Sequence, residues 1–133
     1  MAAAYHGDLA AIARRNEDFR RVLHTDQRSQ LVLMSIAPGT DIGPETHGSI
    51  EQTLFFVSGR GLAVVGGKRF AVHKGTVVVV PPGTRHDFIN TGRVPLKLYT
   101  TYVPPAHIRG RVHRTKADAE ADQQDAAYGD RAR

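Results

Sequence analysis

Glu45 and His47 lie two residues apart, and a carboxylate with an imidazole at this spacing suits proton transfer or metal binding. Alternate side chains of an extended chain point to the same side, so these two groups project together. Inside an apolar barrel they are costly unless they share a cation or hydrogen bonds. A carboxylate beside a cation stays ionised and can accept a proton if it leaves the metal. Glu45 is therefore also the candidate catalytic base.

The composition restricts what such a site can contain. The chain has 133 residues and no cysteine, which excludes a disulfide framework, a zinc ribbon, an iron–sulfur cluster and a thiol nucleophile. Any metal must be held by histidine and by carboxylate or amide oxygens.

The 18 basic and 13 acidic residues are spread almost evenly, which predicts no nucleic-acid partner. No apolar run approaches the roughly 18 residues of a membrane span, and the first residues do not resemble a secretion signal. We therefore predict a cytoplasmic protein without membrane contact.

The elements that position the site are predicted to be short strands. From Gln30 onward, glycine and proline divide the chain into segments typical of an all-β domain. Gly66-Gly67 predicts a two-residue hairpin, and the run Val77 to Val80 predicts a strand covered on both faces. The predicted strands lie near residues 30–36, 44–47, 52–58, 61–65, 68–73, 76–80, 86–90 and 96–103. Strands this short and numerous must fold into a sandwich or closed barrel.

The two ends of the chain are predicted to be helical. Asp8 has the position of an N-cap for an amphipathic helix over 8–15. A second helical turn would include Phe19, Val22 and Leu23, which gives an N-terminal helical arm over 8–24 that packs on the sheet.

The C-terminal tail, residues 104–133, begins with Pro104-Pro105, which ends the last strand because proline lacks a backbone donor. Thr115 and Asp118 have the spacing of a capping box that opens a polar helix. This helix has almost no apolar face and is predicted to be solvated. We expect one domain over residues 1–133, with its core barrel over about 30–103.

The spacing of the site residues resembles the cupin superfamily. The second cupin motif is a glycine, five residues, Pro-x-Gly, two residues, a histidine, three residues and an asparagine. The sequence meets it in full at Gly75, Pro81, Gly83, His86 and Asn90.

In the first cupin motif, Gly39, His47 and Gly59 fit, and Glu45 replaces the usual first histidine. Two residues compete for the position of the motif's glutamate. Gln52 matches both spacings, whereas Glu51 has the preferred chemistry at the wrong distance from Gly59.

The resemblance implies a double-stranded β-helix, or jelly-roll barrel, around one divalent metal. The ligands carried over from the family are Glu45, His47, Gln52 and His86, with Glu51 as the alternative to Gln52. These nitrogen and oxygen donors suit Fe, Mn, Ni, Co or Zn. The wider pattern is similar to a bacterial group of single-domain cupins labelled mannose-6-phosphate-isomerase-like, and the superfamily resemblance implies a homodimer.

Arg85, Tyr99 and Tyr102 are candidates to meet a small-molecule substrate at the barrel mouth. The remaining histidines fit no motif and are predicted to lie on the surface: His6, His24, His73, His107 and His113.

The function predicted from these residues is metal-dependent binding or transformation of a small polar molecule, sugar-like or an oxyacid. Isomerisation or epimerisation and dioxygen chemistry both fit. Two alternatives stay open: a non-catalytic cupin that stores or senses a metal or ligand, and a purely structural barrel in which Glu45 and His47 are only hydrogen-bonded.

Overall fold

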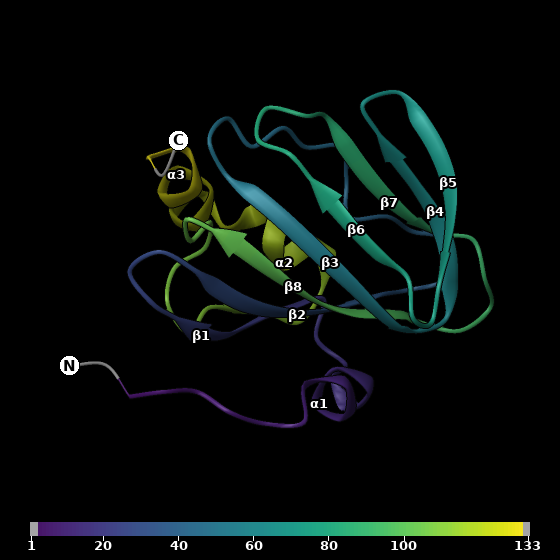
Figure 1. Cartoon of the computed structure of the whole chain (residues 1–133), viewed down its shortest axis with the longest axis horizontal. Helices are drawn as coiled ribbons and strands as arrows, with labels where there is room; N and C mark the ends of the chain where they lie inside the picture. Colours follow the sequence, from purple (N-terminus) through teal and green to yellow (C-terminus); the bar gives the residue numbers. More distant parts are fainter. Residues whose placement is uncertain (1–2, 132–133) are drawn as a thin grey trace.

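The computed structural model describes residues 3–131, most of which form short strands with helices at both ends (Figure 1). The helices are α1 (Leu9–Arg15), α2 (Lys116–Ala121) and α3 (Gln123–Arg131). The strands are β1 (Arg20–Thr25), β2 (Gln30–Ile36), β3 (Glu51–Ser58), β4 (Arg60–Val65), β5 (Lys68–His73), β6 (Val77–Val80), β7 (His86–Asn90), β8 (Leu96–Val103) and β9 (Val112–His113).

The strands form two antiparallel sheets that face each other. One has the order β6-β3-β8-β2-β1-β9, and the other has the order β5-β4-β7. The predicted all-β fold is confirmed, together with the short N-terminal helix and helices in the C-terminal tail. None of the helices in residues 3–131 is long and apolar enough to cross a membrane.

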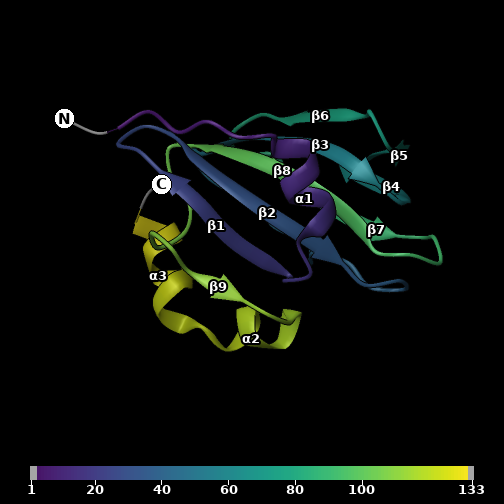
Figure 2. The ribbon, with the colours of Figure 1, turned by 90° about the horizontal axis from the view of Figure 1, so that it is seen from below.

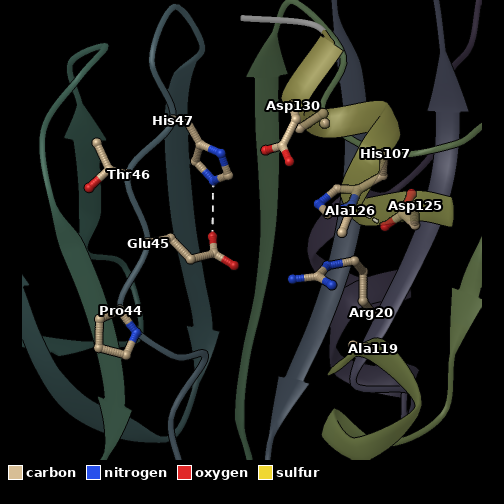
Figure 3. A pocket seen from close by; sticks show the side chains of 12 residues that line it. Arg20, Pro44, Glu45, Thr46, His47, His107, Ala119, Asp125, Ala126 and Asp130 are labelled. Carbon is tan, nitrogen blue, oxygen red and sulfur yellow. Dashed lines mark hydrogen bonds and ion pairs between the residues drawn. The ribbon is translucent and has the colours of Figure 1, made fainter. Parts of the chain in front are cut away.

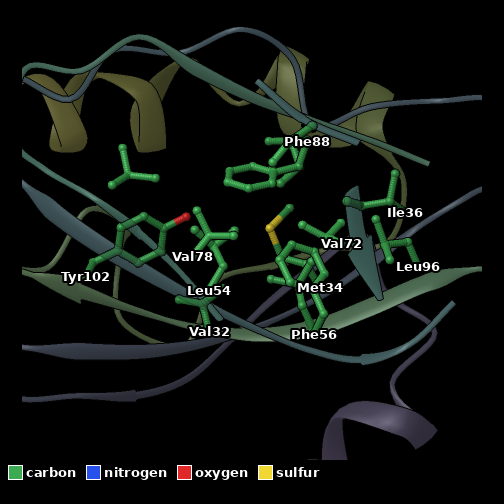
Figure 4. Packing of buried hydrophobic residues seen from close by; sticks show 14 of the residues in the cluster. Val32, Met34, Ile36, Leu54, Phe56, Val72, Val78, Phe88, Leu96 and Tyr102 are labelled. Atoms are coloured by element: carbon green, nitrogen blue, oxygen red, sulfur yellow. The ribbon is translucent and has the colours of Figure 1, made fainter. Parts of the chain in front are cut away.

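The core fills the space between the two sheets (Figure 4). Phe56 from the larger sheet and Phe88 from the smaller one meet there, with ring centroids 5.7 Å apart. Strand β8 alternates with a period of two, so that Leu96, Leu98 and Tyr102 face inward. This same alternation fixes which polar side chains enter the interior.

The Gly66-Gly67 hairpin is confirmed as the turn between β4 and β5. Both glycines have positive φ, 56° and 82°, as a tight primed turn requires.

The prediction that residues 77–80 form a strand covered on both faces is wrong, because β6 is covered on one face only. Val77 and Val79 are 52% and 56% exposed, whereas Val78 and Val80 are buried. The strand lies at the edge of its sheet, so only its inner face is covered. A continuous apolar run does not by itself distinguish a strand covered on both faces from an edge strand.

The prediction of a helical arm over 8–24 is correct only for its first half. Asp8 caps α1, and its side chain accepts a hydrogen bond from the Ala11 amide at 3.2 Å. Residues 20–25 form β1 instead, because they pair with β2 in a register that sets Val22 opposite Val32. Strand pairing here outweighs the helix-like spacing of a few apolar residues.

The C-terminal tail packs on the molecule, against the expectation that it is solvated. The predicted capping box of Thr115 and Asp118 is present. Ala119 in α2 contacts the core cluster, and Asp125 in α3 is buried. Figure 2 shows α2, α3 and β9 beside β1, at the opposite end of the sheet from β6.

Candidate metal centre

One pair of backbone hydrogen bonds sets two of the predicted ligands side by side. A strand was predicted over 44–47, but the structure has only a single bridge, between Glu45 and His86. The amide of each residue donates to the carbonyl of the other at 2.9 Å. Residues paired across an antiparallel ladder share a face, so the two side chains are neighbours. The amide of Gly83, the glycine of the Pro-x-Gly turn, donates to the His47 carbonyl at 2.8 Å and holds the third residue in place.

Glu45, His47 and His86 form a compact cluster. Their potential ligand atoms all lie within 4.8 Å of one another. Glu45 Oε2 and His47 Nε2 are 2.9 Å apart, as the dashed line in Figure 3 marks. The ring centroids of His47 and His86 are 5.4 Å apart. Both histidines are buried, and the Glu45 side chain is 31% exposed, so the cluster opens to solvent on the glutamate side.

His86 presents one particular ring nitrogen to the cluster. Its Nδ1 lies 2.8 Å from the Thr84 carbonyl, which can only accept, so Nδ1 carries the proton. Burial lowers the pKa of His86 below its usual 6.5, despite the opposing effects of the Thr84 carbonyl and Glu45. At neutral pH the ring is therefore uncharged, with a lone pair on Nε2, which is the form that binds a metal.

Glu45 is ionised at neutral pH. Burial acts to raise its pKa, but the hydrogen bond and charge of His47, with the more distant charge of Arg20, outweigh burial and hold the pKa at about 2. The cluster therefore combines a carboxylate with a neutral imidazole that has a free lone pair.

Gln52, rather than Glu51, points into the barrel. Gln52 is buried on the same face of β3 as Leu54 and Phe56, and Glu51 is exposed. The orientation of the Gln52 amide follows from Thr100, whose hydroxyl donates to the Thr53 carbonyl at 2.7 Å. Since that hydroxyl proton is used, Gln52 Nε2 must donate to Thr100 Oγ1, at 3.2 Å. Gln52 Oε1 is then left buried without a hydrogen-bond partner.

These residues fit a divalent cation. A buried amide oxygen without a partner costs about 1–3 kcal/mol, and a cation would satisfy it. Two imidazole nitrogens, a carboxylate and an amide oxygen form a donor set that suits first-row transition metals.

The residues that form the wall of the cavity opposite the cluster were not predicted from the sequence. A cavity of about 330 Å³ separates Glu45 and His47 from Arg20, His107 and Asp125. Figure 3 shows these last three side chains on β1 and the C-terminal segment, facing the cluster across the cavity. The prediction that His107 and His113 are surface residues is wrong, because both are buried. Nothing in the local sequence around them indicates burial, since their partners come from distant segments.

His107 is held from both sides. Gln30 Oε1 accepts from the amides of Ala106 and His107, at 3.2 and 3.0 Å, and Gln30 Nε2 donates to the His107 carbonyl at 2.7 Å. Asp125 Oδ2 lies 2.7 Å from His107 Nδ1, and Asp125 Oδ1 accepts from the Ile108 amide at 2.7 Å. The ring orientation is therefore fixed.

The three predicted substrate-pocket residues lie in different places. Tyr102 is buried between two histidines, with its ring centroid 5.9 Å from that of His47 and 5.1 Å from that of His107. Tyr99 lies on the outer face of the sheet, stacked on Phe55 at 4.8 Å, and does not reach the cavity. Arg85 is exposed in a separate hollow beside His86.

Three histidines predicted to lie on the surface remain. His6 and His73 are exposed, and His24 is half-buried, with its Nε2 3.0 Å from Asp26. None of the three belongs to the cluster of metal-binding groups.

The buried histidines predict that acidification destabilises the metal-free protein. Burial, aided by the Arg20 charge, lowers the pKa of His107 below 6.5, so the unfolded chain takes up a proton that the folded chain does not. The free energy of unfolding should fall as the pH drops from 7.5 to 5.5, by at most about 1.4 kcal/mol per pH unit for each such group. Burial acts to raise the pKa of Asp125, but the His107 hydrogen bond holds it below 3.8, which adds a further loss at lower pH.

Urea unfolding across this pH range, with a chelator present, checks the prediction. His107→Gln should make the slope shallower, whereas His73→Gln, at an exposed position, should leave it unchanged. Equal slopes for the wild type and His107→Gln would contradict the assignment to His107.

Comparison with known proteins agrees with the fold and with the motif. The cupin domain family matches residues 32–102. An uncharacterized protein of Bacillus subtilis, YrkC, is 44% identical over 114 residues, which cover 81% of this chain and 61% of that protein. The uncharacterized protein L612 of Acanthamoeba polyphaga mimivirus is 37% identical over 74% of this chain and 64% of its own length. The chain thus spans less than two thirds of these two relatives.

A crystal structure agrees over nearly the whole chain. That of BH2720 from Bacillus halodurans has a TM-score of 0.88 and 40% identity, over 90% of this chain and 95% of that one. The matched residues 32–102 make up more than half of the sequence and include every predicted ligand. The chain therefore belongs to the cupin domain family.

Proposed function

We propose that the protein binds one divalent metal ion through Glu45, His47, Gln52 and His86. The observation that carries the proposal is the convergence of three ligand groups within 4.8 Å, next to a strand that buries an amide oxygen without a partner. Fe, Mn, Co, Ni and Zn all accept such a donor set. Bound there, the metal would supply a Lewis acid for a carbonyl or hydroxyl group of a small molecule.

We further propose that the site transforms a small polar molecule, with Glu45 as the proton acceptor. This carboxylate is ionised and is the most exposed member of the cluster, on the side of the cavity. An enzyme of this kind would perform isomerisation, epimerisation or dioxygen chemistry, since a divalent metal beside an ionised carboxylate suits either reaction. Isomer formation and oxygen uptake across a panel of sugars and oxyacids would test this part, and a metal-loaded protein without activity would favour a storage or sensing role.

The metal proposal is tested by thermal unfolding with each of the five metals, iron under anaerobic conditions. A ligand that binds only the folded state at 100 times its Kd adds about 2.7 kcal/mol of stability, so a clear rise in Tm is expected. Gln52→Leu should weaken metal binding by about tenfold, as loss of one neutral ligand. Glu51→Leu is the matched control on the outer face of the same strand and should bind as the wild type does. No stabilisation by any metal, with none found by elemental analysis, would contradict the proposal.

We also propose that two copies of the chain associate through the outer face of the larger sheet. Val77, Phe55 and Tyr99 lie in register across β6, β3 and β8, and Val79 is beside Thr53. Val77 and Val79 are exposed at the edge of this face, whereas Phe55 and Tyr99 are half-buried and Tyr99 packs in the same cluster as residues of α1. An exposed apolar edge like that of β6 is typical of a surface that pairs with a partner.

Light scattering is expected to give a dimer mass for the wild type and a monomer mass for Val79→Lys. Val94→Lys, at a valine that is equally exposed but lies outside β6, is the control and should remain dimeric. A monomeric wild type at tens of micromolar would contradict the proposal.

A further inference from the structure

Arg20 is a buried cation without an ion pair. It is only 5% exposed, and no carboxylate in the described residues lies within 4.0 Å of its guanidinium. Its Nε has no hydrogen-bond partner, and its NH1 lies 3.5 Å from His113 Nδ1. The ring of Phe19 lies 5.3 Å from the guanidinium carbon. Burial raises the pKa of the Tyr102 hydroxyl, and the charge of Arg20 together with its hydrogen bond to that hydroxyl only partly opposes the rise.

Such an arginine costs free energy in the folded protein. A buried charge is normally paired or fully hydrogen-bonded, whereas Arg20 has only the neutral Tyr102 hydroxyl and the His113 ring as partners and leaves its Nε unsatisfied. Figure 3 shows the terminal nitrogens of the guanidinium directed into the cavity, toward Glu45 on the far side. The cavity volume, about 330 Å³, lies at the lower end of the range for small-molecule sites. The geometry suits an anionic group of a small ligand between the two walls.

A second polar atom in the same wall is also unsatisfied. His107 Nε2 is buried without a partner. Because Nδ1 donates its proton to Asp125, the uncharged ring presents Nε2 as an acceptor. It would pair with a hydroxyl group of the ligand. Asp125 makes no ion pair with Arg20, since its two oxygens accept from His107 and from the Ile108 amide, although the Arg20 charge contributes to holding the pKa of Asp125 low.

We propose that this cavity binds a small hydroxycarboxylate, with Arg20 on the carboxylate and His107 Nε2 accepting from the hydroxyl. Arginine binds carboxylates through a planar fork of donors, and the imidazole beside it distinguishes a hydroxy acid from a simple acid. This names the ligand class of the proposed metal centre and rests on it, because the same molecule would lie against Glu45 and His47.

The alternative role for Arg20 is to balance the charge of Glu45 across the cavity. The two roles differ in what the arginine affects. An arginine that only balances Glu45 would change metal affinity and leave anion binding unaffected. An arginine that binds ligand would change anion affinity at nearly constant metal affinity.

The test is calorimetric titration of the full-length, metal-loaded protein with glycolate, acetate and glycolamide. Glycolate should bind tightest, acetate more weakly because it lacks the hydroxyl, and glycolamide most weakly because it lacks the charge. Arg20→Gln should weaken glycolate binding by roughly tenfold or more and leave metal affinity within about threefold. Arg21→Gln, at the next residue of β1 and with an exposed side chain, is the matched control and should bind glycolate as the wild type does.

The outcomes separate the two proposals. A protein that binds metal but does not prefer glycolate to glycolamide overturns the hydroxycarboxylate assignment and leaves the metal centre standing. A protein that binds no metal overturns the metal centre itself. Unchanged glycolate affinity in Arg20→Gln also overturns the role of Arg20. If Arg20→Gln does not fold, the three-ligand series on the wild type still decides the ligand class, and Arg20→Lys tests the fork geometry with the charge retained.

Discussion

His86→Ala is expected to reduce the affinity for divalent metal by about 100-fold or more and to abolish the stabilisation that metal gives. Among the proposed ligands, His86 is the one whose geometry is most completely fixed. Its backbone pairs with Glu45, its Nδ1 donates to the Thr84 carbonyl, and its Nε2 is left with a lone pair. Changes to groups that only orient a ligand cost 10–100-fold in metal affinity, so loss of the ligand itself should cost at least as much.

The measurement is the difference in Tm with and without metal, supported by direct titration. Comparing each variant with its own metal-free form separates metal binding from the stability lost with a buried side chain. His73→Ala is the matched control, because His73 lies in the same small sheet but is exposed. If His86→Ala keeps the full metal-dependent rise in Tm, the metal binds elsewhere. The other candidate among the described residues is the cluster of His113, Asp122 and Asp125.

The inward-facing positions of the proposed ligands could be predicted from the sequence because they depend on local rules. Glu45 and His47 share a side through the period of two along an extended chain. The same period places Gln52 with Leu54 and Phe56, and the structure confirms this face as the buried one. The choice between Gln52 and Glu51 could be made only once the structure showed which face of β3 is buried, since a shift by one residue exchanges the two faces.

The opposite wall of the cavity could not be predicted, because it is built by contacts between distant segments. Arg20 lies on a strand that local spacing assigned to a helix, and its neighbour His113 is 93 residues away. His107 is buried by Gln30 and by Asp125. A polar helix without an apolar face is typically solvated, but α3 is held by polar contacts: Asp125 accepts two hydrogen bonds and Gln124 accepts one from Arg111. Such pairings leave no periodic signal in the sequence.

Phe88→Ala is expected to lower the free energy of unfolding by about 3–5 kcal/mol, the cost of removing a fully buried phenylalanine and leaving a cavity. Phe88 is completely buried and lies on β7 between His86 and Asn90. Its ring contacts Phe56 of the opposite sheet, and its centroid is 6.1 Å from that of His86. A typical domain is stable by about 5–15 kcal/mol, so this one substitution removes a large fraction of the total.

Urea unfolding of the metal-free protein measures this effect. Phe70→Ala is the matched control, a substitution of the same type in the same sheet, at a residue that is 39% exposed. It should cost clearly less than Phe88→Ala, since about two fifths of Phe70 is already exposed to water in the folded protein. The loss at Phe88 should also weaken metal binding, because β7 carries His86 and pairs with Glu45. Similar losses of stability for the two variants would show that the two sheets do not share the core described here. Unchanged metal affinity in Phe88→Ala would show that the proposed ligands are held independently of this core.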